Sequence, residues 1–118
     1  MNSKALQNAT LLGTVLQVAM VTAGHFVPFI AMHVFMFGGM GISAIAGFVY
    51  GRGVGSMGGA ALGGALAGGI CAVIGIAVSV VLGDTAAIIL AVGTASSAVT
   101  GAVGGAIGRM LSGVRAAA

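Results

Sequence analysis

The sequence predicts an all-α integral membrane protein in which four transmembrane helices are joined by short loops. Of its 118 residues, 59% are hydrophobic and only 4% are charged, whereas soluble domains carry about a quarter charged residues. In addition, the apolar runs between the charged residues exceed the ~20 residues that a helix needs to cross a bilayer. We therefore expect one membrane domain covering residues 1–118.

Four segments have the length and hydropathy of membrane-spanning helices, and short connectors with the sequences HFVP, GRGVGSM and GDT separate them. Pro28 suits the first turn of the second helix, and Asp84 or Thr85 is expected to cap the fourth. Connectors this short imply that neighbouring helices are antiparallel. The predicted spans are 5–24, 28–50, 58–82 and 86–108.

The charged residues divide cleanly between the two sides that this topology defines. Lys4, Arg52, Arg109 and Arg115 fall on the side of both termini, and the lone acidic residue, Asp84, falls on the other. Basic residues favour the cytoplasmic side of a membrane. The sequence thus predicts that both termini are cytoplasmic, and we expect the protein in the inner membrane of a bacterium.

Small residues recur at every fourth position in three of the four predicted helices. In lipid, helices associate through close van der Waals contact, and such stripes let two backbones approach. We predict glycine-zipper packing. The third predicted helix carries small residues on more than one face, which is more than packing within a single chain requires. These additional faces predict a homo-oligomer or a close fit against a larger membrane complex. The predicted packing residues are Gly39, Ser43, Gly47, Gly59, Gly63, Gly64, Gly68, Gly93, Ser97, Gly101 and Gly105.

Uncharged polar side chains are the candidate lining of a pore. No Asp, Glu, Lys or Arg lies inside a predicted span, which disfavours proton-coupled or ion-coupled exchange. Thr10, Thr14 and Gln17 share one face of the first helix, and Ser97 lies near the middle of the fourth. Such a lining could pass water, a small neutral solute or a weakly hydrated ion. The alternative is that the hydroxyls bond to carbonyls one turn earlier.

The candidate metal ligands lie around the second predicted helix. They are His25, His33, Met36 and Met40, because thioether sulfur suits Cu(I) and imidazole binds copper or haem iron. The spacing of Met36 and Met40 resembles the Met-x-x-x-Met filter of copper-uptake trimers, which also carry a Gly-x-x-x-Gly helix; this resemblance covers five residues and implies Cu(I). Methionine also fills apolar gaps and interfacial histidine snorkels, so no cofactor is assigned.

The sequence predicts no enzyme. It contains no nucleophile elbow, paired carboxylates, zinc-type Cys/His spacing or dinucleotide fingerprint, and its few basic residues are too scattered for nucleic-acid binding. Two functions stay open. The first is a homo-oligomeric channel or facilitator for a small solute or ion, and the alternative is a non-catalytic accessory subunit of a larger membrane complex. A Cu(I)-binding or haem-binding membrane protein ranks third.

Overall fold

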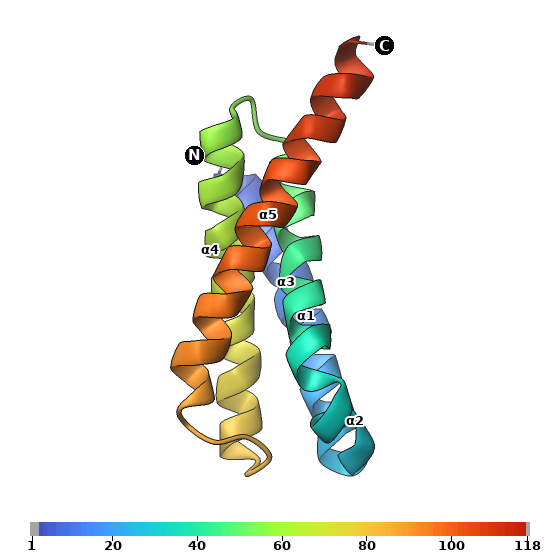
Figure 1. Ribbon diagram of the computed structural model, residues 1–118, viewed down its shortest axis with the longest axis vertical. Coiled ribbons are helices and arrows are strands. Elements are labelled where there is room, and N and C mark those ends of the chain that lie inside the picture. The colour runs from blue at the N-terminus through green and yellow to red at the C-terminus, as the bar shows by residue number, and fades with distance from the viewer. Residues whose placement is uncertain (1–2, 118) are drawn as a thin grey trace.

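The helices of the computed structural model run alternately up and down along one long axis (Figure 1). The structure describes residues 3–117, with side chains as far as Ser112, and this part of the chain is helical without strands. Both ends of the chain lie at one end of the molecule, beside the connector 52–56, and the connector 82–88 lies at the other. The helices are α1 (Ser3–Phe26), α2 (Pro28–His33), α3 (Phe35–Gly51), α4 (Met57–Val81) and α5 (Ile89–Ala117).

The helices have the length and hydropathy of a membrane protein. Within the described residues, three helices are long and apolar enough to cross a membrane: Ser3–Phe26, Met57–Val81 and Ile89–Ser112. The apolar helix Phe35–Gly51 is shorter. This agrees with the predicted class, a helical membrane protein.

The second predicted segment differs from the expectation, because residues 28–50 form two helices instead of one. The break lies at Val34, whose φ of −111° and ψ of −31° keep the chain in the right-handed helical region. The i to i−4 hydrogen bonds continue on both sides, since Val34 N donates to Ile30 O at 2.9 Å and Gly38 N donates to Val34 O at 2.7 Å. The break is therefore a local distortion between two nearly continuous helices. Pro28 opens α2, as predicted from its missing N–H.

The two connectors after α3 and α4 are built differently. Ser56 caps α4, since its side chain accepts a hydrogen bond from Gly59 N at 3.1 Å. The prediction that Asp84 or Thr85 caps the last helix is wrong, because α5 begins only at Ile89. In that connector Gly83 adopts a φ of +83°, a left-handed conformation that glycine tolerates without strain.

Close backbone contacts hold the helices together in one half of the molecule. Seen from α5, glycines 101, 104, 105 and 108 face backbone atoms of α3 or α4, and a Cβ on any of them would collide with a carbonyl group. We call this region the packed half; it comprises residues 40–51 of α3, 57–68 of α4 and 100–112 of α5. The contacting positions are Gly47 with Gly101, Gly51 with Gly105, Ala44 with Gly104, Phe48 with Gly108, Gly64 with Gly101, and Ala60 with Gly105.

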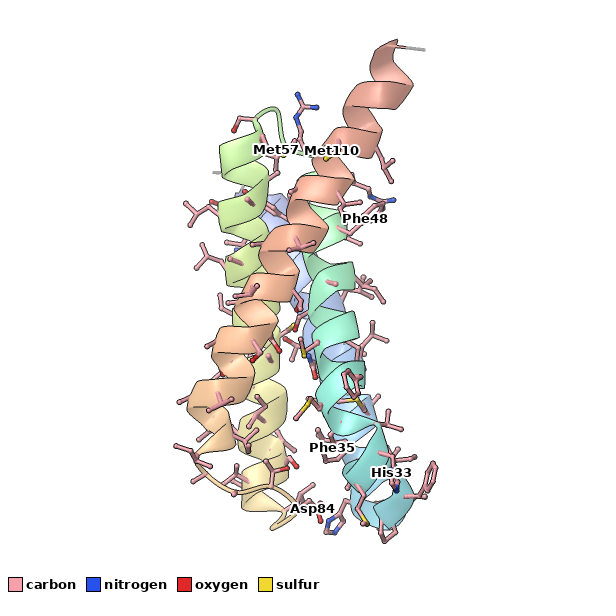
Figure 2. The ribbon with its side chains drawn as sticks, in the orientation of Figure 1. His33, Phe35, Phe48, Met57, Asp84 and Met110 are labelled. Carbon is pink, nitrogen blue, oxygen red and sulfur yellow. The ribbon has the colours of Figure 1, made fainter. Side chains whose placement is uncertain are left out.

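The described charges divide between the two ends as predicted. Lys4 lies in the first turn of α1 and Arg52 follows α3, so both are at the end that holds the termini. Arg109 belongs to the same end, since its Nη2 donates to Gly55 O at 3.1 Å. Asp84 lies at the opposite end (Figure 2). The side chain of Arg115 lies outside the described residues.

Candidate functional site

A cavity of about 400 Å³ occupies the half of the molecule between the packed half and the connector 82–88. We call this region the cavity half. Its walls come from α1, α2, α3, α4 and α5, and from the connector itself. Figure 2 shows Phe35 and His33 on the α2–α3 side and Asp84 at the end of the molecule. The polar residues of the wall are Gln17, Ser79, Asp84, Thr85, Ser96 and Ser97.

Gln17 lies at the inner end of the cavity, where three helices meet. Its side chain is buried, with 2% exposure, and Nε2 lies 3.0 Å from Gly39 O and 3.3 Å from Ser43 Oγ, both in α3. Ser43 Oγ in turn donates to Gly68 O of α4 at 3.0 Å. Gln17 therefore links α1 to α3 directly and to α4 through Ser43, and it stabilises the bundle where the close backbone contacts end.

Two polar atoms on buried residues of the cavity wall make no hydrogen bond within the described part of the chain. Every hydrogen bond of Gln17 uses Nε2, so Oε1 accepts none. Ser97 is 3% exposed; its carbonyl accepts a hydrogen bond from Thr100 Oγ1 at 3.1 Å, whereas its own Oγ makes none. Neither atom is among the fully enclosed unpaired atoms, and both residues border the cavity.

Four methionines form much of the apolar wall. Met32, Met36 and Met40 follow one another at helical spacing along α2 and α3, and Met20 faces them from α1. Met32 is 77% exposed and Met36 is 70% exposed, so this wall is open toward the surroundings. Because methionine is flexible and polarizable, it adapts to differently shaped apolar surfaces.

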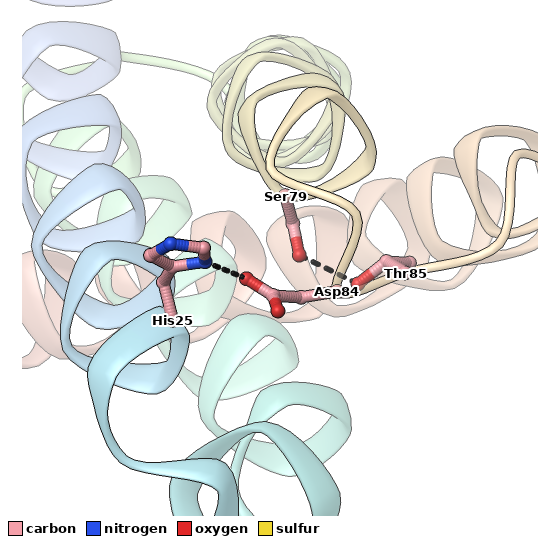
Figure 3. Close-up of polar contacts among 4 residues, drawn as sticks. All are labelled: His25, Ser79, Asp84 and Thr85. Carbon is pink, nitrogen blue, oxygen red and sulfur yellow. Dashed lines mark hydrogen bonds and ion pairs between the residues drawn. The ribbon is translucent and has the colours of Figure 1, made fainter.

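Polar contacts attach the connector 82–88 to α1 and α4 at the end of the cavity half (Figure 3). Nδ1 of His25 lies 2.8 Å from Oδ2 of Asp84, which joins the end of α1 to the connector. The hydroxyl groups of Ser79 and Thr85 lie 2.6 Å apart. These two contacts give Asp84 and Thr85 roles that the sequence analysis missed, and only their spatial neighbours could have identified them.

The predicted packing residues all have close neighbours in the same chain, but the kind of neighbour differs. The α3–α5 and α4–α5 contacts contain Gly47, Gly64, Gly68, Gly101 and Gly105. The others pack on side chains instead: Gly39 on Gln17, Gly59 on Ser56 and Val54, Gly63 on the ring of Tyr50, and Gly93 on Ile76 and Ile89, while Ser43 and Ser97 are buried.

Some contacting glycines escaped the sequence analysis. Gly51, Gly104 and Gly108 meet backbone across the α3–α5 interface. Gly51 was assigned to a connector, although it continues the four-residue spacing of Gly39, Ser43 and Gly47. Gly63, Gly64 and Gly68 of α4 are contacted from inside one chain, so these positions do not by themselves indicate a homo-oligomer.

The candidate pore residues divide into two groups. Gln17 and Ser97 border the same cavity, whereas Thr10 and Thr14 do not. Thr10 Oγ1 is instead buried without a hydrogen-bond partner among the described residues. The predicted stripe along α1 is therefore not one continuous lining.

The candidate metal ligands are also divided. Met36 and Met40 line the cavity, His25 contacts Asp84, and the ring of His33 lies 4.7 Å from that of Phe29. In the part of the chain that the structure describes, no three His, Cys, Asp or Glu side chains gather where they could hold a metal ion.

Comparison with protein-family models, with curated proteins and with solved structures gives no match. The function is therefore argued from the geometry of the cavity.

Proposed function

We propose that this chain is a four-span membrane protein that facilitates the passage of a small solute, and that the solute occupies the cavity. The observation that carries the proposal is a 400 Å³ cavity between apolar helices with the buried side chains of Gln17 and Ser97 in its wall. Solute sites in membrane proteins commonly lie between helices, near the middle of the membrane, and a few polar groups in an apolar wall provide orientation and selectivity.

The proposed membrane topology follows from the positions of the ends and the charges. Both termini lie at the end that carries Lys4, Arg52 and Arg109, so the positive-inside tendency puts them in the cytoplasm. The α2–α3 pair is the second span, since α3 alone is short for a bilayer. In a bacterial inner membrane the cavity half would then lie toward the outer side.

The packed half is the proposed closed side of the pathway. Its glycine contacts, which we propose act as a glycine zipper, leave no room between α3, α4 and α5. The solute would reach Gln17 from the connector end or between α3 and α5. Passage would then require the packed half to separate, as in proteins that expose a central site to one side at a time.

A flux assay in liposomes tests the proposal. Purified protein is reconstituted, and the entry of small neutral solutes is followed by light scattering and that of ions by entrapped dyes. We expect a rate above that of empty vesicles, loss of that rate in Gln17→Leu and Ser97→Leu, and full retention in Gln7→Leu. Gln7 is a matched control because it is exposed on the same helix. If no solute or ion moves faster than in empty vesicles, the proposal fails.

Native mass spectrometry of the same preparation measures the oligomeric state and any bound metal. A homo-oligomer would be compatible with the proposal, because each chain would contain its own cavity. The accessory-subunit alternative predicts larger partner chains at fixed stoichiometry together with no flux by the isolated protein.

A further inference from the structure

The orientation of the Gln17 amide determines what the cavity offers to a ligand. Gly39 O can only accept a hydrogen bond, so the atom 3.0 Å from it must be the nitrogen of the amide. Ser43 Oγ donates to Gly68 O and therefore uses a lone pair toward Gln17 Nε2. The donor side of the amide is thus fixed by protein groups, and the oxygen remains as an acceptor at the cavity wall.

Ser97 differs from its neighbours on α5 in the same way. A hydroxyl group in a membrane helix usually returns a hydrogen bond to a carbonyl one turn earlier, and Ser96 Oγ does so toward Val92 O at 2.9 Å. Thr100 Oγ1 bonds both Ser97 O and Met40 O. Ser97 Oγ has no such partner among the described residues, so a hydroxyl that can donate or accept is left at the wall, on a residue that is 3% exposed.

Gln17 and Ser97 meet at the same level of the bundle. Gly68 of α4 connects them, because its carbonyl accepts from Ser43, the acceptor of Gln17 Nε2. A Cβ on Gly68 would lie 2.8 Å from Ser97 O and 3.1 Å from Ser43 Cβ. The two unpartnered groups therefore define one polar floor, at the inner end of an otherwise apolar cavity.

The charge and size of the cavity restrict the ligand further. Among the described residues, Asp84 is the only charged one in the wall; it lies at the connector end and already contacts His25. A charged ligand at the floor would therefore be buried without a counter-charge, at high cost. A volume of about 400 Å³ has room for on the order of ten water molecules. A single water or a bare ion would leave most of the methionine wall uncovered.

We infer that the cavity binds a neutral molecule with an apolar body and one hydroxyl or amide group, which donates a hydrogen bond to Gln17 Oε1 and contacts Ser97 Oγ. The apolar body lies against the methionine wall. This inference rests on the proposed function because it names the solute class of the same cavity. Since Met32 and Met36 are largely exposed, such a molecule can reach the cavity from the lipid.

Fluorine NMR of the detergent-solubilised protein tests the inference through matched probes. 4-Fluorobenzyl alcohol carries the donor, 4-fluorotoluene lacks it, and 4-fluorobenzylammonium and 4-fluorobenzoate are the charged counterparts; protein-free micelles give the baseline. One hydrogen bond is worth about two- to tenfold in affinity. We expect the alcohol to bind about fivefold more tightly than fluorotoluene, and the charged probes to bind more weakly than either.

Variants locate the preference at the floor of the cavity. Ser97→Ala removes the hydroxyl without touching the Gln17 hydrogen bonds and should reduce the alcohol preference about two- to threefold. Gln17→Leu should abolish it, and Gln7→Leu should leave it unchanged. If Gln17→Leu does not fold, the inference is still tested by comparing the affinities for the alcohol and for fluorotoluene in the unmodified protein and in Ser97→Ala.

Equal binding of alcohol and fluorotoluene, tighter binding of a charged probe, or a preference that survives Ser97→Ala and Gln17→Leu would overturn the inference. Binding is measured without a membrane, so its outcome is separate from that of the flux assay. Alcohol-selective binding without flux would overturn the proposed function alone. Flux without alcohol selectivity would overturn the inference alone.

Discussion

The packed half and the cavity half use the same helices but are held together by different means. In the packed half α5 presents Gly101, Gly104, Gly105 and Gly108, and its backbone touches the backbones of α3 and α4. In the cavity half the same helix presents Ile89 and Val92 to a cavity, together with the small residues Gly93, Ser96 and Ser97. Small residues on α5 alone therefore do not bring the helices together, since α3 presents Phe35, Met36 and Met40 to the same cavity.

The boundary between the halves lies where the glycine contacts end and side-chain hydrogen bonds begin. Among the described residues, the hydrogen bond between α3 and α5 that lies nearest the cavity runs from Thr100 Oγ1 to Met40 O, at 3.0 Å. One turn further, Met36 of α3 and Ser96 of α5 both line the cavity. Gln17 and Ser43 lie at this boundary and join α1, α3 and α4.

The two halves should respond differently to substitution, because lipid provides no hydrophobic force that would hold separated helices together. In the packed half, an added methyl group meets backbone that cannot move aside without shifting a helix. In the cavity half, side chains can rotate into free volume. We therefore expect stability to depend mainly on the packed half, and ligand binding to depend on the cavity half.

The largest effect is expected from Gly47→Ala. Its methyl group would collide with the backbone of Gly101, and overpacking of this kind costs about 1–3 kcal/mol. We expect a loss in free energy of unfolding near the upper end of this range, measured by SDS titration with circular dichroism. Gly41→Ala is the control on the same helix, since a Cβ there meets nothing within 4 Å. Equal losses in both variants would contradict the assignment of the packed half.

These glycine contacts also show how far the sequence predicts the fold. Stripes of small residues at four-residue spacing identify the helices and many of their contacting positions, because helical periodicity fixes which residues share a face. They do not identify the partner of each stripe. The additional faces of α4 suggested a second chain, whereas Tyr50 of the same chain fills one of those positions, at Gly63.

The candidate site was predictable only in part. Gln17 stood out because an amide is costly to bury in an apolar helix, and Ser97 stood out by its position on α5. Their common cavity depends on the separation of α3 from α5, which is a property of the assembled bundle. The contact between His25 and Asp84 spans 59 residues, so no local pattern could reveal it.

An intermediate effect is expected from Gln17→Leu, which removes the hydrogen bonds at the boundary of the halves. Side-chain hydrogen bonds between membrane helices contribute about 0.6 kcal/mol on average and at most about 1.7 kcal/mol. Because Nε2 reaches both Gly39 O and Ser43 Oγ, we expect a stability loss of about 1–2 kcal/mol. A double-mutant cycle with Ser43→Ala isolates their coupling, and Gln7→Leu should cost nothing measurable. A coupling of zero would show that Gln17 does not link α1 to α3 through Ser43.

The smallest effect is expected from Asp84→Asn, at the far end of the cavity half. The side chains of His25 and Asp84 are 36% and 22% exposed, and ion pairs with this much access to solvent contribute roughly 0–1 kcal/mol. Asparagine also keeps an oxygen that can accept a hydrogen bond from the imidazole. We therefore expect a loss below about 0.5 kcal/mol, with a difference from the unmodified protein that shrinks as salt is added.

The connector itself should survive this substitution, because other bonds maintain it. Asp84 N donates to Ser79 O at 3.0 Å through the backbone, and Thr85 Oγ1 meets Ser79 Oγ. Thr85→Val removes the second of these and is the matched variant in the same loop. Thermal melts of both variants at low and high salt measure the two contributions. If Asp84→Asn destabilises the protein more than Gly47→Ala does, then a polar contact at the cavity end, and not the glycine packing, holds the helices together.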